Sequence, residues 1–444
     1  MQLKIERDLN VSNASASNRT VVAACCAVLV VEGFDLAMFG SIVPSLREYE
    51  PWGVDASMIG YMGSAAVFGM LIGALLAAVL VDRIGRRPVV IGAVVLFSAS
   101  MGLSAVAPDS VVFLVLRLLI GIGAGAVMPT VAATLIEFAP AGRRSRNTAL
   151  GFIGVGIGGM VSATLAVWLV PAFGFRAMCL VGALPLVITV PILTRWFPES
   201  PAVLDSRGRN ADASTMRSRY GLEDPDLPTA SEESLSRLSI VFGDGRARGT
   251  LLFWAATFCC LLVTFGVSTW LPDLMRSGGY GLTGALWFLV ALKGGSVVGV
   301  LIAADLADRF GQKPVVASTS LCSALALLAL TLTPSVALAY VLVTIVGLGT
   351  TGLQILINAF VGSYYPAHVR GTGLGLNLSV GRVGGILGPV YLGWFVVQGI
   401  ELDTKFYALA LPAVVAALLL ALVPTRRRDA PDTCSPRTKS KVRQ

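Results

Sequence analysis

Long apolar segments recur along almost the whole chain and constrain its fold more than any other feature. A helix crosses a bilayer core about 30 Å thick with roughly 20 apolar residues. Twelve segments meet this length, near residues 20–43, 57–80, 88–107, 111–136, 148–170, 176–197, 249–275, 283–305, 314–332, 337–361, 371–397 and 403–423. Only 14% of the 444 residues are charged, which excludes an ordinary soluble domain. The sequence predicts an all-α polytopic protein of the cell membrane with twelve transmembrane helices.

Basic residues between these segments indicate their orientation. If the segments alternate in direction, most loop arginines fall on one side, and the opposite loops carry mixed charges. The positive-inside rule then places both termini in the cytoplasm. Because topology accounts for the net charge of +8, no nucleic-acid partner is expected.

The chain repeats itself at an offset of about 226 residues. The stretch "VDRIGRRPVV" (81–90) matches "ADRFGQKPVV" (307–316). Two parallel repeats of six helices usually enclose a site at the membrane midplane between them. We therefore expect two six-helix pseudo-repeats, with this division of the chain: a cytoplasmic N-terminus at 1–19, an N-terminal bundle at 20–197, a cytoplasmic linker at 198–248, a C-terminal bundle at 249–423 and a cytoplasmic tail at 424–444.

Two carboxylates lie inside the first apolar segment, in "VEGFDLAMFGSIVPSL" (31–46). Glu32 and Asp35 are three residues apart and so share one helix face. A charge near mid-membrane costs about 2.5–3.5 kcal/mol on insertion scales, so the pair should face an aqueous cavity or be protonated part of the time. The pair is a candidate for proton or substrate binding; the alternative is that one acid only pairs with a base to fix packing.

The C-terminal half brings bases to a similar depth. Arg382 lies about a dozen residues into the eleventh segment and Lys293 about ten into the eighth. The planar guanidinium of Arg382 can hold a carboxylate through two hydrogen bonds, which a lysine cannot reproduce. Arg382 is therefore the first candidate for binding a substrate carboxylate, the alternative being a salt bridge to Asp35 or Glu32. Lys293 binds substrate or pairs with Asp305.

Charged residues near the cytoplasmic helix ends form a candidate gate that stabilises one access state. Aspartates near helix N-termini are favourable, and arginines can bridge to a neighbouring helix. Topology determination alone is the alternative. The candidate gate residues are Asp82, Arg83, Arg86, Arg87, Glu137, Arg144, Asp308, Arg309 and Arg370.

These motifs resemble the major facilitator superfamily over nearly the whole chain. The loops "DRIGRRP" and "DRFGQKP" are similar to its loop signature, although Ala78 and Ala304 replace the usual glycine, and "RLLIGIGAG" (117–125) resembles a second signature. Within the superfamily, Glu32-Gly33-Phe34-Asp35, "WFPESP" (196–201) and "GRVGGILGP" (381–389) resemble the aromatic acid:proton symporters, most of which carry aspartate where this chain has Glu32.

The resemblance implies proton-coupled import of an aromatic carboxylate such as benzoate, hydroxybenzoate or gentisate by alternating access. It also implies a role for Arg117 in proton transfer or in organising the fourth helix; the alternative is that Arg117 extends toward the outer surface. An aromatic substrate would need apolar walls and partners for ring hydroxyls. Candidates for these are Phe39, Trp270, Gln354, Asn358 and Asn377.

Other classes of function receive less support. Nucleophile triads, a P-loop and metal-ligand spacing are absent from the sequence, and the glycine-rich "GIGAGA" (121–126) lies in an apolar helical run, not after a strand. We therefore expect no enzyme activity, cofactor, metal or nucleotide, and a protein that functions as a monomer. A proton-linked carrier of another organic anion, a sugar or a drug remains the alternative, and a membrane receptor is the rival of a different class.

Overall fold

The computed structural model describes residues 2–139, 144–222, 241–243, 245–332, 335–366 and 369–424; residues 2–17, 144–146 and 149 are described by their backbone alone. Within these ranges, twelve helical spans are long and apolar enough to cross a membrane. Helices account for the regular structure of the described residues, which confirms the predicted all-α fold of twelve spans.

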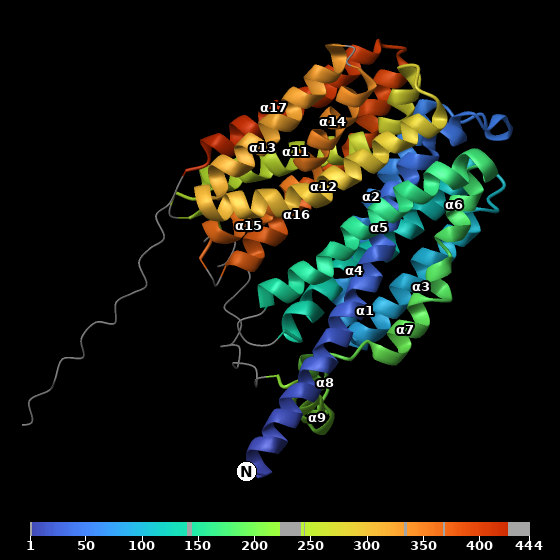
Figure 1. Ribbon diagram of the computed structural model, residues 1–444. Coiled ribbons are helices and arrows are strands. Elements are labelled where there is room, and N and C mark those ends of the chain that lie inside the picture. Colours follow the sequence, from blue (N-terminus) through green and yellow to red (C-terminus); the bar gives the residue numbers. More distant parts are fainter. Residues whose placement is uncertain are drawn as a thin grey trace, which may run out of the picture.

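Seven helices build the first six spans (Figure 1). The bounds are α1 Gln2–Arg47, α2 Ala56–Ile84, α3 Arg86–Ser104, α4 Ser110–Glu137, α5 Arg144–Phe173, α6 Phe175–Val181 and α7 Thr189–Trp196. The sixth span consists of α6 and α7, because the proline-containing 3-10 turn Leu184–Leu186 interrupts it. Helix α1 begins at Gln2, well before the apolar segment that the sequence predicts.

The second six spans follow the same order. Their helices are α11 Ala247–Ser277, α12 Leu282–Phe310, α13 Gln312–Ala329, α14 Val336–Gly347, α15 Leu353–Tyr364, α16 Arg370–Val397 and α17 Leu402–Leu422. The tenth span consists of α14 and α15, joined by a π-helical turn at Leu348–Gly352 in which Thr350 departs from helical geometry.

The repeated loop motif builds the same tight turn in both halves. Gly85 joins α2 to α3 with φ 97°, and Gly311 joins α12 to α13 with φ 89°. Residues with a side chain rarely adopt a positive φ, so glycine is the residue that permits these turns without strain. The matching "DRIGRRP" and "DRFGQKP" thus encode the short connection that reverses the chain at the membrane surface.

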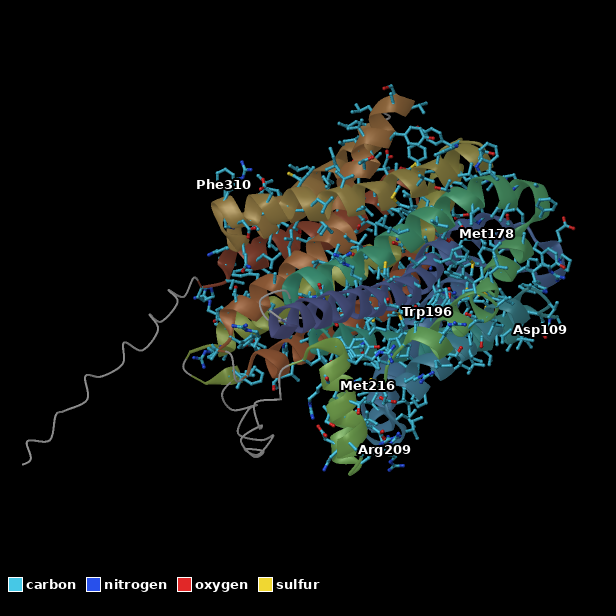
Figure 2. The ribbon with its side chains drawn as sticks, turned by 60° about the horizontal axis from the view of Figure 1, so that its bottom comes forward. Asp109, Met178, Trp196, Arg209, Met216 and Phe310 are labelled. Atoms are coloured by element: carbon cyan, nitrogen blue, oxygen red, sulfur yellow. The ribbon has the colours of Figure 1, made fainter. Side chains whose placement is uncertain are left out.

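Part of the segment between the halves is folded, which the sequence did not predict. Two short helices, α8 Pro201–Ser206 and α9 Asn210–Tyr220, follow the sixth span. Tyr220 packs edge-on against Phe138 of the N-terminal bundle, and the Asn18 side chain donates to the Tyr220 carbonyl at 3.3 Å. Figure 2 marks α9 by Arg209 and Met216, and shows Asp109 and Phe310 near opposite ends of the molecule.

We name the two ends of the molecule by their loops. The linker end carries α8, α9 and the turns at Gly85 and Gly311, and the far end carries the loops that follow α1 and α11. The bundles contact each other through α1 with α11, α2 with α16 and α5 with α12. Their ribbons lie together at the far end and diverge toward the linker end (Figure 1).

Close backbone approaches hold the bundles together on the far side of the midplane. A Cβ built on Gly40 of α1 would lie 1.9 Å from the Ser268 carbonyl oxygen of α11, and one built on Gly60 of α2 would lie 3.2 Å from the Pro389 oxygen of α16. Ser64 adds a hydrogen bond to the Ile386 carbonyl at 2.5 Å. Small residues thus let helices of opposite halves pack tightly here.

Candidate transport site

The two acids of α1 are buried inside the protein. Glu32 is 2% exposed and Asp35 is 4% exposed. Asp35 Oδ1 accepts a hydrogen bond from Arg117 Nη1 of α4 at 2.5 Å, and the Arg117 guanidinium also lies 4.4 Å from the centroid of the Phe39 ring. Arg117 is itself 3% exposed, so the alternative that it extends toward the outer surface is wrong.

Glu32 has a different environment from Asp35. Neither of its carboxylate oxygens has a hydrogen-bond partner among the described residues. Arg382 of α16 lies close enough to act on Glu32 electrostatically, as does Asp35. The half-buried Arg382 forms no ion pair within the described ranges, so the alternative, a salt bridge from Arg382 to Asp35 or Glu32, is not formed in this conformation.

Lys293 lies on α12, which packs against α5 of the N-terminal half. It is 8% exposed, and its Nζ donates to Ser268 Oγ at 3.1 Å. A Cβ built on Gly159 of α5 would lie 3.5 Å from Lys293 Cδ and 3.6 Å from the Gly33 carbonyl oxygen. The lysine stem therefore packs close to Gly159 of the N-terminal half. The alternative pairing with Asp305 is wrong, because Asp305 pairs with Arg309 at 3.0 Å.

The two candidate aromatic residues are packed between helices. Phe39 is 3% exposed and lies over Gly63 of α2, where a built Cβ would be 3.2 Å from its ring. Trp270 of α11 is fully buried and donates from Nε1 to the Pro389 carbonyl at 2.8 Å. Phe39 packs within the N-terminal half and Trp270 within the C-terminal half, and their role as walls for a substrate stays a prediction.

The candidate amide residues lie on α15 and α16. Gln354 Nε2 donates to Asn358 Oδ1 at 3.0 Å, and Thr257 Oγ1 donates to Asn377 Oδ1 at 3.0 Å. Gln354 Oε1 and Asn377 Nδ2 are buried without a partner among the described residues. The amides thus retain hydrogen-bonding capacity, and their contact with a substrate stays a prediction.

The π-helical turn lies directly before Gln354 and was not predicted. Ser296 Oγ of α12, one turn from Lys293, donates to the Gly347 carbonyl at 2.9 Å and lies 3.0 Å from Thr350 Oγ1. This polar contact replaces part of the regular helical bonding and joins the tenth span to the helix that carries Lys293. Such turns are frequent at functional sites.

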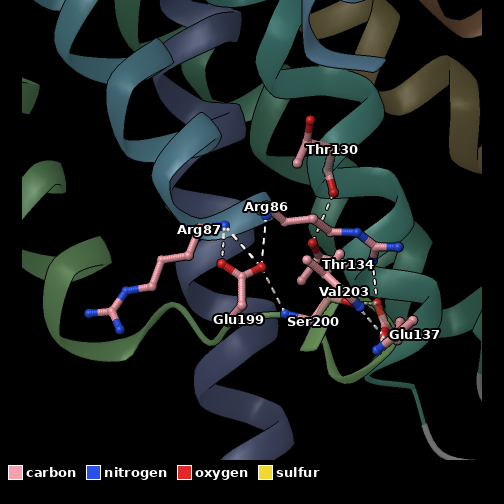
Figure 3. A network of polar contacts seen from close by, with 9 residues as sticks. Arg86, Arg87, Thr130, Thr134, Glu137, Glu199, Ser200 and Val203 are labelled. Atoms are coloured by element: carbon pink, nitrogen blue, oxygen red, sulfur yellow. Dashed lines mark hydrogen bonds and ion pairs between the residues drawn. The ribbon is translucent and has the colours of Figure 1, made fainter. Parts of the chain in front are cut away.

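A polar cluster at the linker end joins α3 and α4 to Glu199 and Ser200, which precede α8 (Figure 3). Glu137 of α4 forms an ion pair with Arg86 of α3 and accepts from Ser200 Oγ at 2.6 Å. Glu199 accepts from the backbone N–H of Arg86 at 2.7 Å and from that of Arg87 at 3.3 Å. These bonds cap α3, whose own preceding residue is a glycine without a side-chain cap.

Glu137 and Arg86, both candidate gate residues, thus pair with each other, and Glu199 and Ser200 are two members of the cluster that the gate prediction omitted. Their signal was present in "WFPESP", which the sequence offered only as a family likeness.

The other predicted gate residues do not join the two halves in this conformation. Asp82, Arg83, Asp308 and Arg370 are exposed, Arg309 pairs with Asp305 of its own helix, and Arg87 donates to the Thr194 carbonyl. The side chain of Arg144 lies outside the described residues. Across the described ranges, no ion pair joins the bundles at the linker end, so a gate there stays a prediction for another conformation.

Ion pairs between the halves lie at the far end instead. Arg47 Nη1 of α1 lies 2.6 Å from Asp273 Oδ2 of α11, and Glu48 pairs with Arg276. Pro44 and Ser277 join these four residues around a surface cavity of about 320 Å³. The far-end loops carry mixed charge in the sequence, and the signal for these ion pairs is that opposite charges follow equivalent helices of the two repeats.

Two six-span bundles with buried charged residues between them are typical of a polytopic carrier of small solutes. The model of the Major Facilitator Superfamily matches residues 25–389 and 287–443. The chain belongs to this superfamily and is a multi-pass membrane transporter, not an enzyme. Groups of residues that could hold a metal ion are absent from the described part of the chain.

Similar proteins narrow the family further. The chain is 30% identical to a benzoate transport protein of Acinetobacter baylyi, over 98% of this chain and 96% of that protein. It is 34% identical to a gentisate transporter of Corynebacterium glutamicum, over 89% and 85% of the two chains. The fold is also that of a solved D-xylose-proton symporter, with a TM-score of 0.72 at 19% identity, over 90% of this chain and 96% of that chain.

Proposed function

We propose that this protein imports a small aromatic carboxylate, such as benzoate, a hydroxybenzoate or gentisate, together with a proton. One observation carries the proposal. Glu32 and Asp35 are buried in the N-terminal half, and Arg382 of the C-terminal half lies close enough to act electrostatically on Glu32. The relatives whose names state benzoate and gentisate transport support the substrate class.

Alternating access is the mechanism that fits two bundles around a midplane site. We assign the linker end to the cytoplasm by the positive-inside rule, which also places both termini there. The far-end contacts and ion pairs then correspond to a state that is closed to the outside. Import would require these contacts to break while the charged residues of the linker end approach each other, with one chain sufficient for the cycle.

Each site residue has a proposed role. Arg382 would hold the substrate carboxylate through two hydrogen bonds, and Lys293 would add a second positive charge. Gln354, Asn358 and Asn377 would bind ring hydroxyls, and Phe39 and Trp270 would shape the apolar wall. One proton moving with one monoanion carries no net charge, so the pH gradient alone would drive import.

Uptake by cells tests the proposal. Cells expressing the chain would be given labelled benzoate, hydroxybenzoates and gentisate at two external pH values, with and without a protonophore. We expect saturable uptake beyond that of empty-vector cells, rising at acid pH and collapsing with the protonophore. Carrier-dependent uptake of none of these acids would contradict the substrate class, and uptake insensitive to pH and protonophore would contradict proton coupling.

A further inference from the structure

The two acids of α1 differ in a way that separates their roles. Both are buried to nearly the same degree, at 2% exposure for Glu32 and 4% for Asp35. Asp35 is held by Arg117 at 2.5 Å, whereas both oxygens of Glu32 lack a hydrogen-bond partner among the described residues. One carboxylate is thus already neutralised by a cation, and the other is not.

Without the negative charge of Asp35, the buried positive charge of Arg117 would have no partner. Arg117 is 3% exposed, its Nε has no hydrogen-bond partner in the described part of the chain, and its other contact is the face of the Phe39 ring. Removing the negative partner of a buried ion pair leaves the remaining charge uncompensated, which is strongly unfavourable. The pair of Asp35 with Arg117 therefore fixes α1 against α4.

Glu32 presents the opposite case. A charged carboxylate buried without hydrogen bonds is unfavourable, while the neutral acid avoids most of that penalty. The charged groups around it are Asp35 on its own helix and Arg382 on α16, with Arg117 of α4 at Asp35 and the stem of Lys293 of α12 near Gly159 of α5. Helix α5 packs on this face through glycines, and its own charged residues lie only in its first turn.

Arg382 is the cation that can serve Glu32. Lys293 donates to Ser268, and Arg117 is paired with Asp35, but Arg382 forms no ion pair within the described ranges. A guanidinium binds one carboxylate through two parallel hydrogen bonds, so a second carboxylate competes for the same donors.

We propose that Glu32, and not Asp35, carries the transported proton, and that Arg382 binds either the ionised Glu32 or the substrate carboxylate. This inference rests on the proposed function for the identity of the substrate. With its proton bound, Glu32 is neutral and Arg382 is available to the substrate. When the substrate leaves toward the linker end, the Glu32 O–H bond breaks, the proton passes to water, and the resulting carboxylate takes the place of the substrate at Arg382.

This exchange explains why proton and substrate would move together. In the empty carrier the ionised Glu32 carboxylate binds Arg382. In the loaded carrier the substrate carboxylate binds Arg382 instead. Substrate bound while Glu32 is ionised would place two carboxylates beside one guanidinium, and this state is unfavourable because like charges repel.

Infrared difference spectroscopy tests the assignment without any substrate. Purified protein in lipid would be titrated with acid, and the carbonyl stretching band of protonated carboxyl groups followed in wild type, Glu32→Gln and Asp35→Asn. The exposed Asp308→Asn serves as a matched control, and thermal unfolding checks that each variant is folded. We expect one component of this band to be missing from Glu32→Gln and to be retained in Asp35→Asn and Asp308→Asn.

Three results would overturn the inference: no component of the wild-type band that is missing from Glu32→Gln, loss of that component in Asp35→Asn, or its loss in Asp308→Asn. In a second measurement, proteoliposomes containing Glu32→Gln should exchange labelled for unlabelled gentisate but not accumulate it under a pH gradient. Accumulation by this variant equal to that of wild type would also overturn the inference. If wild type moves no aromatic acid while the band behaves as expected, the proposed substrate is wrong and the assignment of the proton to Glu32 stands.

Discussion

At the scale of single residues, the buried pair of Asp35 and Arg117 is the interaction whose loss should have the largest effect. Both side chains are nearly inaccessible, and they join α1 to α4 at 2.5 Å. Removing one member of such a pair typically costs about 3–5 kcal/mol, because the other charge stays buried. Removing both members leaves no unpaired charge.

We therefore predict that Arg117→Gln lowers the midpoint of thermal unfolding in detergent, and that adding Asp35→Asn restores most of the loss. The double variant should still not transport, because the proposed site lacks the ion pair that positions α1 against α4. Unfolding midpoints measured by intrinsic fluorescence for both single variants and the double variant provide the comparison. Additive losses in the double variant would show that the two residues act independently.

The charged residues also show what the sequence could and could not predict. Helical spacing predicted that Glu32 and Asp35 share one face of their helix. Counting residues along each span predicted that Arg382 and Lys293 lie at a similar depth in the membrane. The partner of Asp35 could not be predicted, because Arg117 lies on another helix and its rotation and depth depend on how α1 packs on α4. The absence of a hydrogen-bond partner for Glu32 among the described residues likewise depends on how the helices pack, and the residue pattern could not predict it.

At the scale of helices and turns, the two repeats allow one turn to be compared with its equivalent in the other half. Gly85 and Gly311 occupy equivalent turns with positive φ, but their surroundings differ. A Cβ on Gly85 would lie 2.4 Å from Glu199 Oε2, whereas a Cβ on Gly311 meets nothing within 4 Å. The N-terminal turn is therefore tied to the Glu199 cap of α3, and the C-terminal turn has open space around it.

We predict that Gly85→Ala is more destabilising than Gly311→Ala. Both changes pay the strain of positive φ, of order 1 kcal/mol, and Gly85→Ala also displaces a cap of about 1 kcal/mol. Denaturation midpoints of the two variants in the same detergent give the difference. Equal losses would indicate that the Glu199 contact with α3 contributes little to stability.

Sequence patterns located the regular helices better than their interruptions. Apolar length predicted twelve spans, but not the break at Leu184–Leu186 or the π-helical turn at Leu348–Gly352. The π-helical turn depends on Ser296 of a neighbouring helix, which supplies hydrogen bonds that replace those of a regular helix. Contacts of this kind arise between segments that are distant in the sequence.

At the scale of the whole molecule, the two halves meet at the far end and are joined there by ion pairs. Arg47 with Asp273 is partly buried, while Glu48 with Arg276 is more exposed. An exposed pair contributes roughly 0.2–1 kcal/mol, so the two pairs can shift an equilibrium between access states without fixing it.

We predict that the double change Asp273→Asn and Arg276→Gln favours opening at the far end. The measurement uses a variant with every cysteine replaced and one new cysteine at Ser64, which lies in the contact between α2 and α16. Labelling from outside by a membrane-impermeant thiol reagent should become faster when the ion pairs are removed. Glu401→Gln, also in a far-end loop, is the matched control, and an unchanged labelling rate would argue against a role for these pairs in closure.

The central claim is that a proton and an aromatic carboxylate cross together at the Arg382 site. The most direct measurement is gentisate accumulation in proteoliposomes under an imposed pH gradient of either sign, comparing wild type with Arg382→Lys and Arg382→Gln. We predict that wild type accumulates gentisate only when the outside is more acidic, that Arg382→Lys retains a small part of this activity, and that Arg382→Gln has none. Accumulation that ignores the sign of the gradient, or full activity in Arg382→Gln, would contradict the claim.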